Sequence, residues 1–200
     1  MVQPAIPIDG QVGVRFGRTM VVTSHADVFN HQVEAIVCPA NRRGVMGAGI
    51  AGTLRLAGGI EIEREAMALA PLTIGTAIVT TSGSLSGRGV RCIIHAIVSD
   101  ALGAPTRKDI VAHATASALE QADRQRVRSV LIPRLGSGLG PGRLPGTTVT
   151  EVMLEEIIAH LRRFRSRIDT IVLHQPDRRE SEFVREALEE ARRLFWEVRD

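Results

Sequence analysis

Residues 34–52 read Glu-Ala-Ile-Val-Cys-Pro-Ala-Asn-Arg-Arg-Gly-Val-Met-Gly-Ala-Gly-Ile-Ala-Gly, an apolar run followed by a glycine-rich segment. The first part, 34–38, is a run of strand length without polar alternation, which predicts a strand buried on both faces. The glycine-rich part, 41–52, follows that strand and leads into a helical pattern. In open α/β sheets ligands bind at the carboxyl ends of strands, and glycine lets backbone amides approach them. This loop is therefore a candidate binding site.

The same order of elements continues along the chain, because short β-branched runs alternate with longer helical patterns. The predicted strands are 12–16, 19–23, 34–38, 76–81, 91–98, 129–133 and 170–174. The predicted helices are 50–57, 60–70, 106–124, 147–165 and 181–198, with hydroxyl caps expected at Thr106, at Thr147 or Thr148, and at Ser181. The pattern predicts a three-layer α/β/α domain with a mixed, largely parallel central sheet of six or seven strands.

Length and composition predict one globular domain. The 200 residues suffice for a sizeable core, and no linker separates a second domain, so 1–200 is expected to be one unit with 1–18 as an N-terminal extension or extra strand. Hydrophobic residues make up 44%, which excludes a disordered chain. No apolar run approaches a membrane span and the start lacks a signal peptide, so a cytoplasmic location is expected. Cys38 and Cys92 lie in apolar runs, predicting buried thiols and no metal site.

The charge balance bears on nucleic-acid binding. The net charge is +3, carried almost entirely by arginine. Asp and Glu are interleaved through most of the basic stretches, as on a solvated helix face. Aromatic residues are only 3%, so the stacking surfaces that single-strand binders use are largely missing. Nucleic acid is therefore a secondary partner hypothesis.

The first glycine loop formally contains the dinucleotide fingerprint Gly-x-Gly-x-x-Gly over 47–52. In a Rossmann unit the strand runs straight into the first glycine, whereas residues 39–46 intervene here, and no strand-ending acid follows. Glu61 and Glu63 lie in a helical pattern instead. What remains is a set of amides at a helix N-terminus, where an anion such as phosphate is favoured.

The second glycine loop, 136–146, also follows a predicted buried strand. It lacks the Lys-Ser/Thr ending of a Walker loop, so triphosphate hydrolysis is not expected, and a nest of amides around a diphosphate fits better. Two such loops on two strands could clamp one pyrophosphate between them.

At this point the residues resemble a known family, the macro domains that bind ADP-ribose. The resemblance spans 20–194 and rests on three segments in order: Ala26-Asp27-Val28; 34–41 followed by Gly47-Ala48-Gly49-Ile50; and 132–140. The sequences of segments 44–51 and 133–139 look most like those of two branches of the family, the terminal ADP-ribose glycohydrolase and the bacterial DNA-ADP-ribose hydrolases. The resemblance implies a macro-like fold and an ADP-ribose ligand, with no metal or other cofactor.

The resemblance also implies roles by position. Asp27 would accept a hydrogen bond from the adenine amino group, and Val28 would offer a backbone amide to the ring. Asn41 would face the distal ribose. The diphosphate and that ribose would be held by the remaining predicted ligand-binding residues: Gly47, Gly49, Ile50, Ser137, Gly138, Leu139 and Gly140.

Departures from the family pattern bear on catalysis. Hydrolytic members need a polar group beside the distal ribose, to orient water, form an adduct or transfer a proton. Their acid or lysine positions are occupied here by Ala48, Ala51 and Gly140, and Cys38 replaces the first asparagine of the Asn-Ala-Ala-Asn run. The catalytic residues therefore stay unknown.

Four other side chains have two interpretations each. His95 and Asp100, after a central strand, are candidate catalytic groups, but a non-catalytic role is favoured for both, with core packing expected for the histidine. Cys38 is either an activated thiol or packing, and packing is favoured because no cation is placed to lower its pKa. Asp27 is either an adenine ligand or a helix cap, and the adenine contact is favoured.

The leading hypothesis is a reader that binds ADP-ribose or an ADP-ribosylated macromolecule. The alternative is a hydrolase that removes ADP-ribose from protein or nucleic acid. A third hypothesis, ranked last, is a nucleic-acid binder that relies on its arginines.

Overall fold

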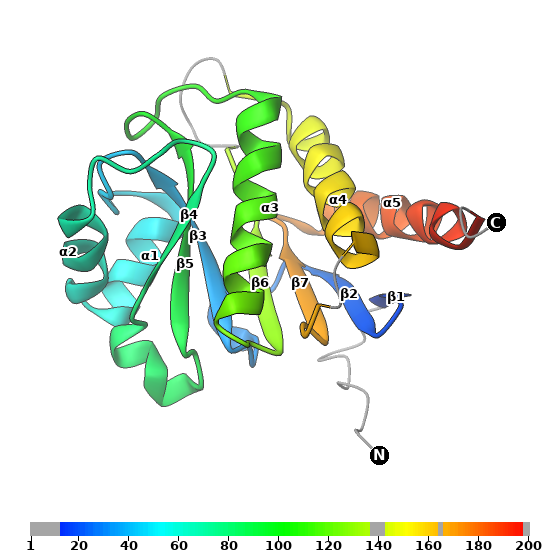
Figure 1. Cartoon of the computed structure of the whole chain (residues 1–200), viewed down its shortest axis with the longest axis horizontal. Coiled ribbons are helices and arrows are strands. Elements are labelled where there is room, and N and C mark those ends of the chain that lie inside the picture. The colour runs from blue at the N-terminus through cyan, green and yellow to red at the C-terminus, as the bar shows by residue number, and fades with distance from the viewer. Residues whose placement is uncertain (1–12, 137–142, 164–165, 198–200) are drawn as a thin grey trace.

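A computed structural model describes residues 13–136, 143–163 and 166–197 (Figure 1). Seven strands form one sheet in the order β1-β2-β7-β6-β3-β5-β4. The strands are β1 Gly13–Phe16, β2 Thr19–Ser24, β3 Ala35–Asn41, β4 Ala77–Thr80, β5 Cys92–Ser99, β6 Ser129–Pro133 and β7 Thr170–His174. The five central strands are parallel, and β1 and β4 pair antiparallel at the two edges. The predicted mixed, largely parallel sheet is confirmed.

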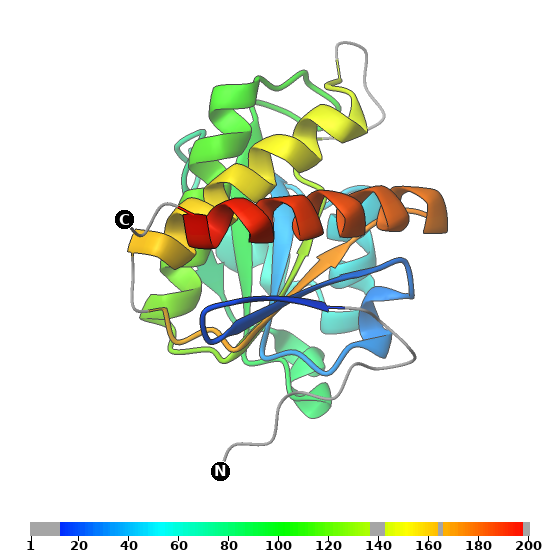
Figure 2. The same cartoon turned by 90° about the vertical axis from the view of Figure 1, so that its right-hand side faces the viewer.

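Helices cover both faces of the sheet, which confirms the predicted three layers (Figures 1 and 2). One face carries α1 Gly49–Gly58 and α2 Glu61–Ala68, and the other carries α3 Lys108–Arg124, α4 Gly146–Arg163 and α5 Arg178–Glu197. Within the described ranges there are also two 3-10 helices, η2 Val28–Asn30 and η3 Gly83–Arg88. Sequence reasoning left both of these short helices out.

The side chains of β3 show how the buried strand serves two cores. Ala35 and Val37 belong to the apolar cluster under α3, α4 and α5, whereas Ile36 and Cys38 belong to the cluster under α1. Successive residues of a strand point to opposite faces, so a strand with helices on both sides needs apolar residues at every position. This explains the missing alternation in 34–38.

The predicted hydroxyl caps are wrong. The N-cap residue of α3 is Arg107, and the buried hydroxyl of Thr106 has no hydrogen-bond partner within the described residues. Helix α4 begins at Gly146, so Thr147 and Thr148 lie inside it. Helix α5 begins before Ser181, whose hydroxyl shares a hydrogen bond with Thr23. Tertiary contacts thus take hydroxyls that local pattern assigns to caps.

None of the helices in the described part of the chain has the length and apolar character needed to span a membrane.

Candidate functional site

The sheet opens between β3 and β6 at their carboxyl ends. Strand β3 pairs with β5 along its whole length, and β6 pairs with β7 over all its residues. In contrast, β3 and β6 pair only at Ala35 with Val130 and at Ile36 with Leu131. Pro39 and Pro133, which cannot donate backbone hydrogen bonds, occupy the parts of the two strands that separate.

The chain connections favour a binding crevice at the same place. After β3 the chain passes through α1 and α2 to β4 and β5, on one side of β3. After β6 it passes through α4 to β7, in the opposite direction. Adjacent parallel strands whose connections diverge leave a crevice at their carboxyl ends, and ligands of open α/β sheets bind there. The two glycine loops start on the two sides of this opening.

The first glycine loop is braced from within by Asn41. The buried side chain donates from Nδ2 to the carbonyl of Val45 at 2.7 Å, and its Oδ1 accepts from the backbone of Arg43 at 3.0 Å. The structure therefore gives Asn41 a loop-shaping role, and its place beside a distal ribose stays a prediction.

A second brace comes from α2. The buried carboxylate of Glu63 accepts the backbone N–H of Met46 at 2.7 Å and pairs with Arg55 at 3.1 Å. The middle of the loop is thus tied to the helix behind it.

The start of α1 presents free amide groups. Its N-cap residue, Ala48, makes no side-chain cap, and the first bond at this end runs from the Gly52 N–H to the Ala48 carbonyl. The N–H groups of Gly49 and Ile50 therefore have no partner inside the helix. Gly49 has a φ of 56°, and a Cβ there would meet open space. Such amides, together with the helix dipole, favour a bound anion.

The structure describes the second glycine loop at Gly136 and again from residue 143. This glycine has a φ of 76°, and a Cβ on it would lie 2.6 Å from Thr106 Cγ2. Beside it, Arg134 pairs with Glu180 of α5 and lines a cavity of about 340 Å³. The predicted residues Ser137, Gly138, Leu139 and Gly140 lie outside the described residues.

Asp27 and Val28 follow β2, at the same end of the sheet. Asp27 caps η2, since its Oδ1 accepts the Phe29 N–H at 2.8 Å, and its side chain is otherwise exposed. Val28 is buried as the first residue of η2, where the helix leaves its N–H unused. The structure thus shows the capping contact and leaves the carboxylate accessible.

Two histidines lie beside this turn. Burial, followed by the nearby His174, lowers the pKa of His31, against an opposing effect of Asp27. Burial is also the main cause that lowers the pKa of His174, whose ring hydrogen-bonds to the backbone of Ala26. Both imidazoles are therefore neutral near pH 7, and they lie beside the exposed carboxyl group of Asp27.

The Macro domain family model matches residues 37–153, more than half of the chain. The chain belongs to the Macro domain family. An uncharacterized protein of Aquifex aeolicus (strain VF5) is 42% identical over 124 residues, which is 62% of this chain and 72% of that protein.

Solved structures confirm the macro-like fold of this Macro domain. A variant of the Oceanobacillus iheyensis macrodomain with ADPR has a TM-score of 0.77 at 18% identity, covering 90% of this chain and 98% of that one. The macrodomain of Thermus aquaticus DarG has a TM-score of 0.65 at 24% identity, covering 79% and 99%. At these identities the likeness is one of fold, and the branch within the family stays a prediction.

Both cysteines of this Macro domain are buried. Cys38 is fully buried, and burial raises the pKa of its thiol to about 12. Cys92 is also buried and free, so the predicted reduced thiols are confirmed. Within the described ranges, no three His, Cys, Asp or Glu side chains are placed to share a metal ion.

His95 is a core residue of the Macro domain. It lies fully buried in β5, where Nε2 shares a hydrogen bond of 2.9 Å with Thr80 Oγ1 and Nδ1 has no partner within the described residues. Burial lowers the pKa of His95 to about 4, against a small opposing effect of Glu65. The favoured core interpretation is confirmed, although only one ring nitrogen is satisfied.

The buried His95 predicts an acid-sensitive stability. Because its pKa is about 4 when folded and 6.5 in the reference state, the unfolded chain binds the proton first. The stability that depends on neutral His95 is fully present above pH 6.5 and is lost as the pH falls. The loss of unfolding free energy reaches about 3 kcal/mol at pH 4. Urea unfolding at several pH values should show a shallower acid decline in His95→Gln. The exposed His113→Gln is the control, and equal declines in both variants would contradict the assignment.

Asp100 lies beyond the end of β5, at the side of the first loop. With Arg42, Arg43, Ala70 and Pro71 it lines a cavity of about 380 Å³. Its carboxylate is largely exposed and lies 3.8 Å from the Arg42 guanidinium. The predicted position near a strand end is thus found, with the charge directed toward an arginine.

Glu63 and Arg134 are the site residues that sequence reasoning missed. Glu63 appears in the sequence only as one more acid of an amphipathic helix. Arg134 stands in a glycine loop, but its partner Glu180 is 46 residues further along the chain. The one available signal for Glu63 was its position on the apolar side of α2, next to Ile62 and Ala66 in the buried set.

Proposed function

We propose that this Macro domain binds ADP-ribose in the crevice between β3 and β6. The observation that carries the proposal is the parting of these two strands directly below two glycine loops, one of which ends in the uncapped amides of α1. A diphosphate is the anion that two facing sets of amides suit. The similar Oceanobacillus iheyensis structure that contains ADPR supports this choice.

The ligand is proposed to lie along the carboxyl edge of the sheet. The adenine would reach Asp27 and the amide of Val28 at one end. The diphosphate would lie between the amides of Gly49 and Ile50 and the second loop, Ser137–Gly140 in the predicted assignment. Gly47 and Asn41 would border the distal ribose, with Asn41 acting mainly through the shape of its loop.

We infer that the domain acts as a reader of ADP-ribosylated macromolecules. Ala48 and Ala51, the first two positions where hydrolytic relatives are expected to carry a reactive group, are inert here. The two candidate substitutes in the strands are also unsuited, because the Cys38 thiol has a pKa of about 12 and His95 is enclosed in the core. Neither can supply a nucleophile or a base to the crevice.

Calorimetric titration of ADP-ribose is the experiment that tests this function. We expect one-to-one micromolar binding that AMP cannot match. Asp27→Ala should weaken binding ~10- to 100-fold, since a hydrogen bond to a charged group contributes ~1.5 to 3 kcal/mol. Asp27→Asn keeps the η2 cap and serves as the control for stability, because asparagine caps as well as aspartate does. Unchanged affinity in both variants would exclude the adenine contact.

A release assay separates the reader from the hydrolase. Incubation with ADP-ribosylated protein or DNA should yield no free ADP-ribose, although the domain binds the modified substrate. Release that is abolished by Asp100→Asn would identify a hydrolase and overturn the reader assignment. Asp100 is the relevant carboxylate because it borders the cavity beside the first loop.

A further inference from the structure

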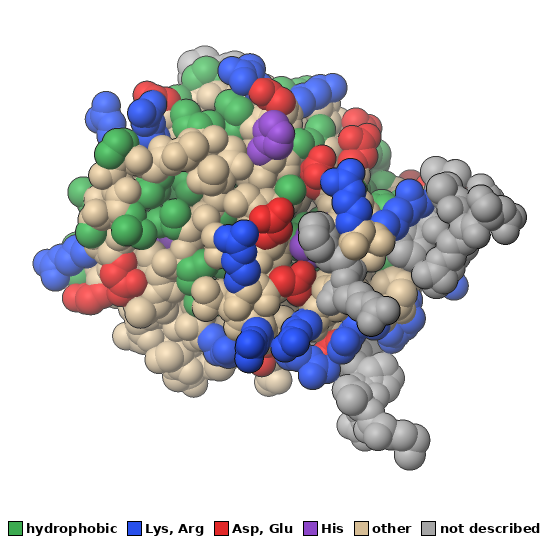
Figure 3. Space-filling model, viewed as in Figure 1, with side chains coloured by type: hydrophobic (Ala, Val, Ile, Leu, Met, Phe, Trp, Pro, Cys, Tyr) green, Lys and Arg blue, Asp and Glu red, His purple; other side chains and the backbone are tan. Residues whose placement is uncertain are grey.

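A dense set of arginines lies at the end of the sheet opposite the crevice. Strands β2, β7, β6, β3 and β5 begin at this edge, and the β1–β2 turn closes it (Figure 1). Six exposed arginines gather here, and we name this surface the basic edge: Arg15, Arg18, Arg91, Arg126, Arg128 and Arg167. Figure 3 shows basic side chains in a row along the lower border of the molecule.

The basic edge has a surplus of positive charge. Three carboxylates lie among its residues: Glu34, Asp123 and Asp169. Six arginines against three acids leave a surplus equal to the formal net charge of the whole chain, +3. The basic edge thus carries a local excess of positive charge.

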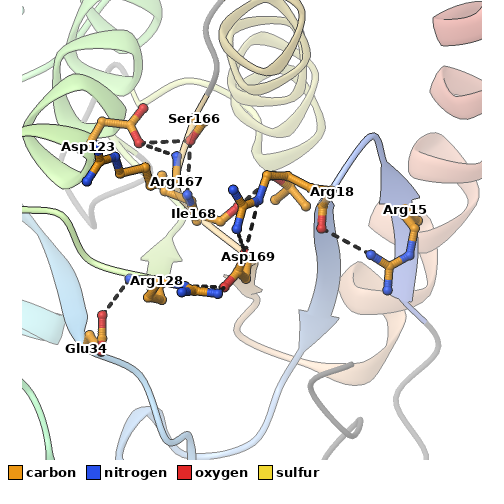
Figure 4. Close-up of polar contacts among 10 residues, drawn as sticks. Arg15, Arg18, Glu34, Asp123, Arg128, Ser166, Arg167, Ile168 and Asp169 are labelled. Carbon is orange, nitrogen blue, oxygen red and sulfur yellow. Dashed lines mark hydrogen bonds and ion pairs between the residues drawn. The ribbon is translucent and has the colours of Figure 1, made fainter. Parts of the chain in front are cut away.

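The middle of the basic edge is built around Asp169. The guanidinium groups of Arg18 and Arg128 converge on this one carboxylate, with Arg18 Nη2 at 2.7 Å from Oδ1 (Figure 4). Arg18 comes from the β1–β2 turn and Arg128 from the residue before β6, so one acid orders two cations from distant segments. Both side chains remain about half exposed, which leaves N–H groups available for a ligand.

Contacts extend this centre to both sides. Arg15 donates to the carbonyl of Arg18 at 3.1 Å. On the other side, Glu34 accepts the backbone N–H of Arg128 and lies 3.6 Å from the guanidinium of Arg91. Arg91 also donates to the carbonyls of Gln125 and Arg126. The row thus crosses six neighbouring strands, or ~24 Å at the usual strand spacing.

The chemistry of the surface selects its partner. Guanidinium groups bind phosphate oxygens with two N–H groups at once, and ~24 Å of duplex presents about 14 phosphates. The exposed large apolar residues of the described chain are Leu56, Ile60, Met67, Leu69 and Leu102, none of which belongs to this edge. A protein interface would need such an apolar centre, and a single strand would need aromatic stacking surfaces.

We propose that the basic edge binds the phosphate backbone of a nucleic-acid duplex without reading its sequence. Since this border lies at the opposite end of the strands from the glycine loops, the duplex and a ligand of the crevice can be bound together. The proposal does not depend on the proposed function of the crevice.

Fluorescence anisotropy with a duplex of about 20 base pairs tests the proposal, using one sequence as DNA and as RNA. The variant Arg15→Gln/Arg126→Gln/Arg167→Gln removes three positive charges. None of these three arginines forms an ion pair with Asp169. We expect at least ~10-fold weaker binding, with a log-log salt slope shallower by ~2 to 3, because each phosphate contact contributes about 0.9. The duplex that binds more tightly shows whether the natural partner is DNA or RNA.

A matched variant removes the same charge elsewhere. Arg64→Gln/Arg107→Gln/Arg178→Gln alters three exposed arginines that pair with acids on α2, α3 and α5. This control should bind the duplex within ~2-fold of the parent. Equal losses in both triple variants, displacement of the duplex by ADP-ribose, tighter binding of a single strand, or no binding by the parent at ~50 mM salt would each overturn the proposal. ADP-ribose titration shows whether the crevice is intact in each variant.

Discussion

Glu63→Ala is expected to lower the free energy of unfolding by about 3 kcal/mol and to weaken ADP-ribose binding by more than ~10-fold. The variant removes the acceptor of the Met46 N–H and the partner of Arg55 together. A buried amide without a partner costs ~1 to 3 kcal/mol, and the partly exposed Arg55 adds a smaller penalty after solvent screening. Binding should fall because the loop that carries the α1 amides is no longer tied to α2.

Glu61→Ala is the matched control for Glu63. It lies on the same helix, and its carboxylate only pairs with Arg64 across an exposed surface at 3.6 Å. Exposed pairs of this kind contribute ~0 to 1 kcal/mol. Chemical denaturation compares the unfolding free energies of the two variants, and calorimetric titration compares their affinities for ADP-ribose. Equal behaviour of the two would show that Glu63 does not hold the loop.

Gly44→Ala is expected to destabilise the protein by about 3 kcal/mol and to abolish a well-formed first loop. Gly44 has a φ of 73°, in the left-handed region that disfavours side chains. In addition, a Cβ there would lie 2.8 Å from the carbonyl carbon of Ala66 in α2. Because the obstacle is backbone, either the loop or the helix has to move. Loss of ADP-ribose binding should accompany the loss of stability.

Gly89→Ala separates the two causes. Gly89 has a φ of 85°, and a Cβ there would meet nothing within 4 Å. This variant therefore carries only the conformational cost, about 1 kcal/mol, at a position that closes η3. In thermal unfolding, the midpoint temperature of Gly44→Ala should be well below that of Gly89→Ala. A Gly44→Ala protein as stable as Gly89→Ala would mean that the contact with α2 is loose.

The elements of this fold are predictable from sequence because burial on two faces leaves a local trace. Ile36 and Val37 point to different cores, so the strand reads as an uninterrupted apolar run. The glycine loops are equally visible, since positive φ at Gly49 and Gly136 demands that residue type. The location of the candidate site follows from these two signals and the topology rule for parallel sheets.

The internal support of the site is not predictable in this way. Glu63, the Arg134–Glu180 pair and the Thr23–Ser181 hydrogen bond join segments whose proximity exists only in the folded chain. Ser181 shows the consequence, because its hydroxyl suits a cap locally but serves β2 instead. The opening between β3 and β6 was only partly predictable from the sequence. Pro39 and Pro133 were visible in the sequence, but their effect required knowing that the two strands are neighbours.

Because both thiols are buried, the native protein should not react with maleimide dyes. Cys38 is enclosed with a thiol pKa of about 12, and burial also raises the pKa of Cys92. Thiolate is the reactive form, so neither cysteine competes for such a reagent while the chain is folded. A cysteine introduced at the exposed Gln125, whose φ of −74° suits any side chain, would then carry a single fluorophore on the wild-type background, close to the basic edge and far from the crevice.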